Sequence, residues 1–144
     1  MYRQTLFPRY RGINLDGMFC TSKSTCANPV YGTRRGRFLE KDFQEVADFG
    51  FNFVRLPLTY RLFTVPEKPY ELNDRKLEML DQAVAWGEKY HLHININFHR
   101  VPGYCVNADE EEDPFQLCQS PEGIRYFCML WQNLAERYRG IPST

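Results

Sequence analysis

The chain has 144 residues, of which 43% are hydrophobic and 25% are charged, a composition typical of one folded globular domain and not of a disordered segment. Its 18 basic and 18 acidic side chains give a formal net charge of 0, so charge predicts neither nucleic acid nor an anionic membrane as a partner. No apolar run reaches the roughly 18 residues of a membrane-spanning helix, so no transmembrane segment is expected.

The N-terminal segment, residues 1–10, contains arginines but no apolar core, so it lacks the pattern of a secretory signal. We expect a cytoplasmic protein, or a secreted one if the true N-terminus lies upstream. The cysteines are odd in number, which predicts no disulfide framework and at least one free thiol in a monomer. They are Cys20, Cys26, Cys105, Cys118 and Cys128.

An extended segment is expected first, over residues 10–15, and a loop rich in Gly, Ser, Thr, Asn and Pro follows it to about Gly36. Apolar residues then recur at helical spacing from residue 39 to 47, and Gly50 stands where a left-handed cap would end that helix. The aromatic and β-branched run over residues 51–58 predicts a buried strand.

A second helix is expected over residues 74–90, because Asn73 can cap its first amides and Asp74 suits the positive end of the dipole. Apolar and polar residues alternate over 92–99, which predicts a strand whose polar row is His93, Asn95, Asn97 and His99. A third helix begins after Ser120, with Pro121 at its first position, and ends before Gly140.

This order of strands and helices predicts a parallel sheet, for which a doubly wound nucleotide-binding fold and a (β/α) barrel are the two candidates. A nucleotide-binding fold would have the spacing G-x-G-x-x-G or G-x-x-x-x-G-K-[ST] after the first strand. The glycines near this strand fit neither spacing: Gly12, Gly17, Gly32 and Gly36. Asn14, Arg55 and His99 follow one another at 41 and 44 residues. Eight such units need roughly 340 residues, within the range of barrels, so this chain would hold the first three.

The polar row of the third strand has two interpretations. It could face water on a sheet with one solvated side. Because a helix follows every strand, however, we expect both faces of the sheet to be covered, and the row then faces a barrel interior or a cleft at the strand ends.

Several motifs stand at the predicted strand ends and helices. They are Arg11-Gly12-Ile13-Asn14-Leu15, Gly50-Phe51-Asn52-Phe53-Val54-Arg55-Leu56-Pro57, Leu80-Asp81-Gln82-Ala83-Val84, Trp86-Gly87, Asn97-Phe98-His99-Arg100-Val101-Pro102-Gly103-Tyr104 and Leu134-Ala135-Glu136-Arg137-Tyr138. In this order and spacing the chain resembles the N-terminal part of glycoside hydrolase family 5, the cellulase-like (β/α)8 TIM barrels.

The resemblance implies retaining hydrolysis of β-linked glycans by two Glu residues, one as acid/base and one as nucleophile, without a cofactor. In the family these residues follow the fourth strand, in an Asn-Glu motif, and end the seventh. No Asn-Glu pair occurs in the sequence. We therefore expect residues 1–144 to be an incomplete N-terminal part of a single catalytic domain, which lacks both catalytic Glu residues and is inactive alone.

The resemblance carries two active-site residues over, Arg55 and His99, as supports of the nucleophile and of sugar hydroxyls. We predict that their side chains meet at the C-terminal edge of adjacent strands. An interior salt bridge for Arg55 and a satisfied buried histidine for His99 are the structural alternatives. Glycan contacts are expected from residues after the second and third strands, with loop packing as the alternative: Tyr60, Arg61, Arg100, Tyr104 and Asn107.

No metal site is predicted, because His93 and His99 would stand roughly 20 Å apart along one strand. The acidic run from Glu110 to Asp113 is interpreted as a solvated surface. A polysaccharide-degrading glycosidase is the leading function, with an oligo- or polysaccharide as its partner. A carbohydrate-binding barrel without chemistry, and an unrelated barrel enzyme with a phosphate-bearing substrate, are the alternatives.

Overall fold

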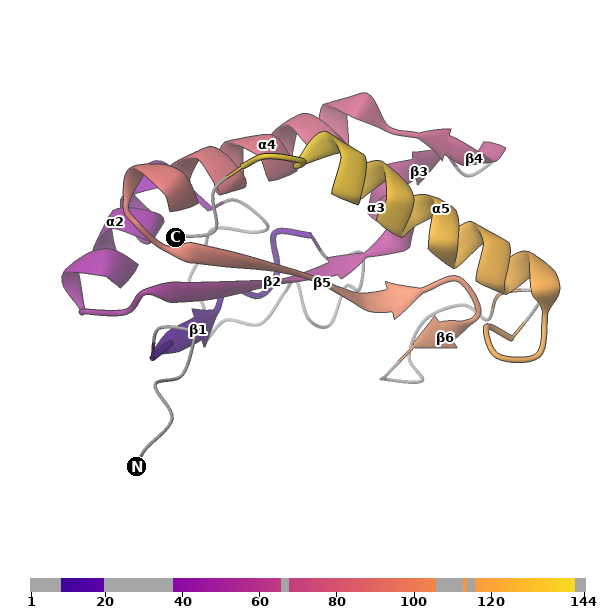
Figure 1. Cartoon of the computed structure of the whole chain (residues 1–144), viewed down its shortest axis with the longest axis horizontal. Helices are drawn as coiled ribbons and strands as arrows, with labels where there is room; N and C mark the ends of the chain where they lie inside the picture. The colour runs from indigo at the N-terminus through magenta and orange to yellow at the C-terminus, as the bar shows by residue number, and fades with distance from the viewer. Residues whose placement is uncertain (1–8, 20–37, 66–67, 106–112, 114–115, 142–144) are drawn as a thin grey trace.

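The computed structural model describes residues 9–19, 38–65, 68–105, 113 and 116–141, and its centre is a four-stranded sheet (Figure 1). The strand order is β1-β2-β5-β6. Strands β1 (Gly12–Asn14), β2 (Phe53–Thr59) and β5 (His93–Val101) are parallel neighbours, and β6 (Tyr104–Cys105) turns back antiparallel to β5. The three predicted strands and their parallel arrangement are therefore confirmed, with β1 shorter than expected.

The three predicted helices are confirmed as α2 (Glu40–Asp48), α4 (Asp74–Lys89) and α5 (Pro121–Arg137). The Asn73 side chain accepts a hydrogen bond from the Lys76 amide at 3.3 Å, and this bond caps α4. The hydroxyl of Ser120 caps α5 in the same way by accepting from the Gly123 amide. Gly50 has the predicted positive φ, 81°, just after α2.

The three predicted helices lie on the same face of the sheet (Figure 1), which leaves the polar row of β5 on the face that a barrel turns inward. Val54 and Leu56 of β2 are fully buried beneath this layer, and Phe98 of β5 packs edge-on against Trp131 of α5 at 5.0 Å. A doubly wound fold has helices on both faces. The one-sided layer therefore favours a barrel segment, and we name the side on which the described residues place no helix the open face.

Four short elements lie near the C-terminal ends of β2 and β5 and were absent from the prediction. After β2 the chain forms the one-turn helix α3 (Tyr60–Phe63) and a hairpin of β3 (Thr64–Val65) and β4 (Lys68–Leu72). After β5, Pro102 and Gly103 form the turn into β6. Elements of two to five residues are too short to show a helical or alternating hydrophobic period, so the pattern contains no sign of them.

The parallel pairing of β2 with β5 contains one irregularity at the end that carries the predicted site. Leu58 pairs with Phe98, and the next residue, Thr59, pairs with Arg100. His99 is therefore an extra residue on β5, as in a β-bulge. Such a bulge redirects the side chains around it and bends the strand.

The opposite end of the sheet is filled by aromatic rings. Phe53 and His93 are register partners and stack at 5.3 Å, and the Tyr10 ring lies 4.9 Å from His93. A Cβ added to Gly12 would stand 2.5 Å from the Phe53 ring, so only glycine leaves room for this packing. His93 thus belongs to the end of β5 remote from His99. In the described parts of the chain, no helix is long and apolar enough to span a bilayer.

Candidate active site

Arg55 stands at the centre of a polar cluster on the open face. Its guanidinium donates through Nη1 to Asn14 Oδ1 at 3.3 Å and through Nη2 to Asn97 Oδ1 at 2.6 Å. Nη2 also lies 3.2 Å from His99 Nδ1. The prediction that the Arg55 and His99 side chains meet is confirmed, but Arg55 is the third of the seven residues of β2 and does not end that strand, which continues to Thr59.

The strand register explains this meeting. Asn14 is the register partner of Arg55 on β1, and Asn95 is its partner on β5. Because side chains on one face recur every second residue, Asn97 and His99 continue the row from Asn95 toward the C-terminal edge. The strands on either side of β2 thus form a cage around the guanidinium, with Asn14 from β1 and Asn97 and His99 from β5.

The protonation of His99 follows from its contact with Arg55. A guanidinium has no acceptor, so the Nη2–Nδ1 contact requires a lone pair on Nδ1 and leaves the proton on Nε2. Burial lowers the pKa of His99 below its ordinary value, and the positive charges of Arg55 and Arg100 lower it further, while Asp16 opposes them. His99 is therefore a neutral imidazole near pH 7, with Nε2–H available as a donor.

The hydrogen-bond partners of Arg55 among the described residues are uncharged, so no carboxylate in that part of the chain is bonded to its guanidinium. This arrangement differs from the interior salt bridge that was the structural alternative. A preorganised cation beside a neutral donor suits an anionic group or a developing negative charge. From the sequence, Asn14 was used only to measure the 41-residue step to Arg55 and was not proposed as a site residue, and Asp16 was not considered.

The predicted glycan-contacting residues lie in different environments. Tyr104 is 56% exposed on β6, whereas Arg100 is buried, at 5% exposure. Tyr60 is also buried, at 6% exposure, with its ring edge-on to Tyr126. Asn107 lies outside the described residues. Their roles in glycan binding stay predictions.

A second polar cluster surrounds Asp113, whose side chain is only 13% exposed. The carboxylate accepts hydrogen bonds from the Tyr60 hydroxyl, from Arg61 Nη2 at 2.9 Å and from the Gly103 amide at 2.6 Å. Burial raises the pKa of Tyr60, and the contact with Asp113 raises it further, so the phenol stays a donor. The interpretation of Asp113 as part of a solvated acidic surface was wrong, because these three donors hold it inside the fold.

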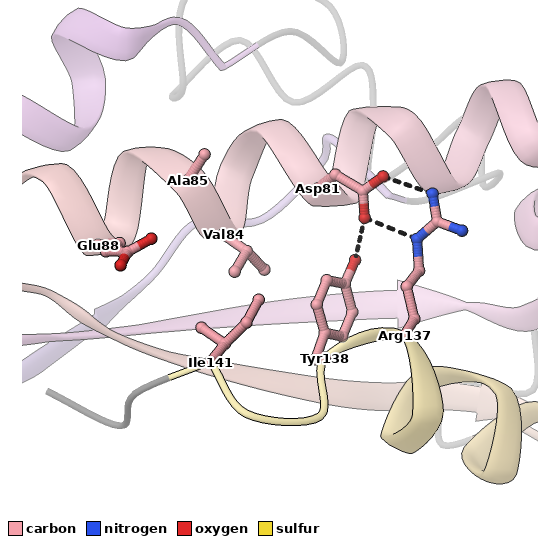
Figure 2. A pocket seen from close by; sticks show the side chains of 7 residues that line it. All are labelled: Asp81, Val84, Ala85, Glu88, Arg137, Tyr138 and Ile141. Carbon is pink, nitrogen blue, oxygen red and sulfur yellow. Dashed lines mark hydrogen bonds and ion pairs between the residues drawn. The ribbon is translucent and has the colours of Figure 1, made fainter.

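A separate hollow lies between α4 and α5, on the helix side of the sheet (Figure 2). Asp81 of α4 accepts from Arg137 Nε at 2.7 Å, from Arg137 Nη2 and from the Tyr138 hydroxyl at 2.9 Å. The remaining lining is Val84, Ala85, Glu88 and Ile141. This ion pair joins the two helices, and the hollow is remote from Arg55. The hydrogen bonds that Asp81 accepts from Arg137 and Tyr138 explain physically why these two sequence motifs occur in the same chain.

Metal ligands do not gather in the described residues, where no group of three or more His, Cys, Asp or Glu side chains is placed to hold an ion. The cluster around Arg55 consists instead of one cation, two amides and an imidazole. Its chemistry is therefore that of hydrogen bonding and charge stabilisation.

Comparison with known sequences gives a consistent family. The model of the cellulase family, glycosyl hydrolase family 5, matches residues 11–143. Endoglucanase C of Acetivibrio thermocellus is 30% identical over 99 residues, which cover 69% of this chain and 28% of that protein. A probable glucan 1,3-beta-glucosidase A of Aspergillus clavatus is 38% identical over 100 residues, which cover 69% of this chain and 24% of that protein.

Comparison with solved structures gives the same fold. A crystal structure of a glycoside hydrolase superposes with a TM-score of 0.78 at 26% identity and covers 94% of this chain and 38% of its own. Thermotoga maritima Cel5A in complex with mannotriose gives a TM-score of 0.63 at 23% identity, over 92% of this chain and 37% of its own. The chain thus spans between about a quarter and two fifths of the proteins it matches.

Proposed function

Because the chain belongs to the cellulase family, glycosyl hydrolase family 5, we propose that it forms the N-terminal part of a (β/α)8 catalytic domain that hydrolyses β-linked glycans with retention. Its three parallel strands then correspond to the first three of the barrel. The open face is the barrel interior, and the acid/base and nucleophile carboxylates come from strands outside this chain.

The observation that carries the proposal is the cage around Arg55. Its guanidinium has no carboxylate partner among the described residues, and Asn14, Asn97 and His99 hold it toward the open face. In a retaining glycosidase the nucleophile must stay ionised beside the sugar. A fixed guanidinium stabilises such a carboxylate and orients its oxygens by charge-assisted hydrogen bonds.

His99 would act as a neutral donor in this mechanism. With Nδ1 accepting from Arg55, Nε2–H is free to bond a carboxylate oxygen or a sugar hydroxyl. The lowered pKa of His99 keeps a second positive charge away from Arg55 near neutral pH. The pair therefore offers one permanent charge and one neutral donor.

Glycan binding is proposed for the loops after β2 and β5. The exposed ring of Tyr104 is suited to stacking on a pyranose face. Asn107 could bond hydroxyls, and the buried side chains of Tyr60 and Arg100 would act from beneath the surface. Solved relatives were crystallised with cellobiose and with mannotriose, which supports β-linked gluco- and manno-oligosaccharides as the substrate class.

The test is hydrolysis by the full-length protein of soluble β-glucan and of mannan. Reducing ends are measured first, and NMR then follows the anomer that is released. We expect release of the β-anomer before mutarotation. Release of the α-anomer contradicts the retaining mechanism, and glycan binding without any turnover indicates the non-catalytic barrel instead.

A further inference from the structure

The Asp113 cluster lies just beyond the C-terminal ends of β2 and β5, and it connects the two chain segments that follow these neighbouring strands. Tyr60 and Arg61 follow the last residue of β2, and Gly103 follows β5. Gly103 lies four residues after His99, and Tyr60 lies five after Arg55. The cluster thus stands at the same edge of the sheet as the candidate active site, just beyond the C-terminal ends of β2 and β5.

Gly103 connects Asp113 to the β5–β6 turn by a hydrogen bond from its amide. Val101 pairs with Tyr104 across this turn, and Gly103 has a φ of 73°. Pro and then Gly at the two central positions, with positive φ at the second, match a type II turn. The amide of that second residue has no partner inside the turn, and here it donates to Asp113 at 2.6 Å.

A further hydrogen bond holds the same residue from the other side. The Gly103 carbonyl accepts from the Leu117 amide at 3.1 Å. Both peptide groups of Gly103 are therefore anchored, and Tyr104, the next residue, projects an exposed ring from an anchored backbone. A ring so held loses little further freedom when a ligand stacks on it.

We propose that Asp113 is a positioning residue for glycan binding, which fixes the β5–β6 turn through the Gly103 amide and thereby sets the place of the Tyr104 ring. The inference rests on the proposed function and deepens it. Arg61 and the Tyr60 hydroxyl share the carboxylate and hold it in place. The substrate class that would sense this residue is a β-linked oligosaccharide long enough to reach beyond the Arg55 cluster.

The chain contains a matched control for this proposal. Asp81 also accepts from an arginine and an adjacent tyrosine, Arg137 and Tyr138, but it joins two helices on the other side of the sheet. Asp113→Asn and Asp81→Asn each replace a carboxylate oxygen by an amide in an Asp–Arg–Tyr cluster. A purely structural role predicts the same consequences for both.

The experiment compares both variants with wild type in the full-length protein, by kinetics on cello- and manno-oligosaccharides of increasing length. For Asp113→Asn we expect KM to rise about tenfold on the longer oligosaccharides while kcat stays within about twofold. We expect Asp81→Asn to lower Tm without changing KM. In a Tyr104→Ala background, Asp113→Asn should raise KM no further, because the residue acts through that ring.

Amide hydrogen exchange at Gly103 and Tyr104 gives a second measurement that needs no activity. It should speed up in Asp113→Asn and stay unchanged in Asp81→Asn. An equal KM for the two Asp variants, or additive effects of Asp113→Asn and Tyr104→Ala, overturns this inference alone. A wild type that neither binds nor hydrolyses β-glycans overturns the proposed function as well, whatever the exchange data show.

Discussion

At the scale of single residues, the site depends on one guanidinium whose partners are neutral. Arg55 and His99 were found from the sequence because both stand in family motifs on neighbouring strands. The amides that hold Arg55 were harder to identify, since an asparagine in a strand carries no signal of what it will bond. Asp113 was misinterpreted for a similar reason: neighbouring acidic residues suggest solvent, and two of its three donors, Tyr60 and Arg61, lie more than 50 residues away in sequence.

The first prediction concerns Arg55. In the full-length protein, Arg55→Ala should lower kcat/KM. The expected loss of transition-state stabilisation is about 2–4 kcal/mol, the range for losing one preorganised electrostatic group. Arg55→Lys should recover little, because an ammonium cannot reproduce the planar fork that reaches Asn14 and Asn97 together. Circular dichroism should show an intact fold. The exposed Arg125→Ala is the control, and unchanged hydrolysis in Arg55→Ala would remove this residue from the site.

The second prediction concerns the pKa of His99. Arg55→Gln should raise this pKa, because the positive charge beside Nδ1 is lost. NMR titration of the imidazole ring measures it, with the exposed Arg75→Gln as a control that should leave the pKa unchanged. A shift of the His99 pKa of the same size in Arg55→Gln and Arg75→Gln would contradict the conclusion that Arg55 lowers this pKa.

The sign of the linked stability change follows from the same pKa. Since the folded pKa of His99 lies below its ordinary value, the unfolded chain binds the proton more readily. The contribution of His99 to stability is therefore complete above about pH 6.5, the unperturbed pKa of histidine, and is lost as the pH falls toward the folded pKa. Urea unfolding at pH 7 and pH 5 measures this loss as a decrease in the free energy of unfolding. The decrease should be smaller in Arg55→Gln than in wild type.

At the scale of elements, hydrophobic period and capping residues predicted the helices and strands that form the framework. Asn73, Ser120 and Gly50 mark ends that the structure reproduces, because each acts on backbone groups close by in sequence. The side of the sheet on which the helices pack was not predicted from the sequence. That choice depends on how the sheet curls, which is a property of several strands together and leaves no local pattern.

The third prediction tests how α4 packs on β5. A glycine within a helix is usually less stable than alanine by about 1 kcal/mol. A Cβ on Gly87, however, would stand 2.6 Å from Ile94 Cδ1 and 3.1 Å from the Leu92 carbonyl oxygen. Gly87→Ala should therefore destabilise the protein, by about 1–3 kcal/mol in chemical denaturation.

A double-mutant cycle provides the control for this prediction. In an Ile94→Ala background the crowded side chain is gone, so Gly87→Ala should be less destabilising than in wild type. Stabilisation by Gly87→Ala alone would show that the helix has room to move away from the strand, and the close packing argument would fail.

At the scale of the whole molecule, α2, α4 and α5 lie on one side of the sheet, and the residues that the structure describes place no helix over the other side (Figure 1). Large apolar side chains are also exposed elsewhere in the described chain, with Phe49 at 81% and Ile124 at 48%. In a complete barrel of the family, further strands and helices would adjoin these surfaces. Exposed apolar surface and open strand edges favour association between copies.

The fourth prediction is that the 144-residue chain, expressed by itself, hydrolyses no β-glycan and associates in solution. Glycoside cleavage needs two carboxylates about 5–5.5 Å apart, and the partners of Arg55 and His99 in the described residues include none. Reducing-end assays on β-glucan and mannan, with light scattering on the same samples, check both parts. Turnover by a monodisperse monomer would contradict the proposal that the catalytic pair comes from outside the chain.

The strand order also has a consequence in time. Each parallel strand pairs with the one that precedes it in the sequence, so a newly made strand finds its partner already synthesised. The 41-residue step from Asn14 to Arg55 takes roughly two to eight seconds at translation rates of 5–20 residues per second. Until a further strand arrives, β6 covers only Arg100 and Val101 of the edge of β5 among the described residues. We therefore expect the uncovered edge of β5 to be a part of the nascent chain that needs protection from aggregation.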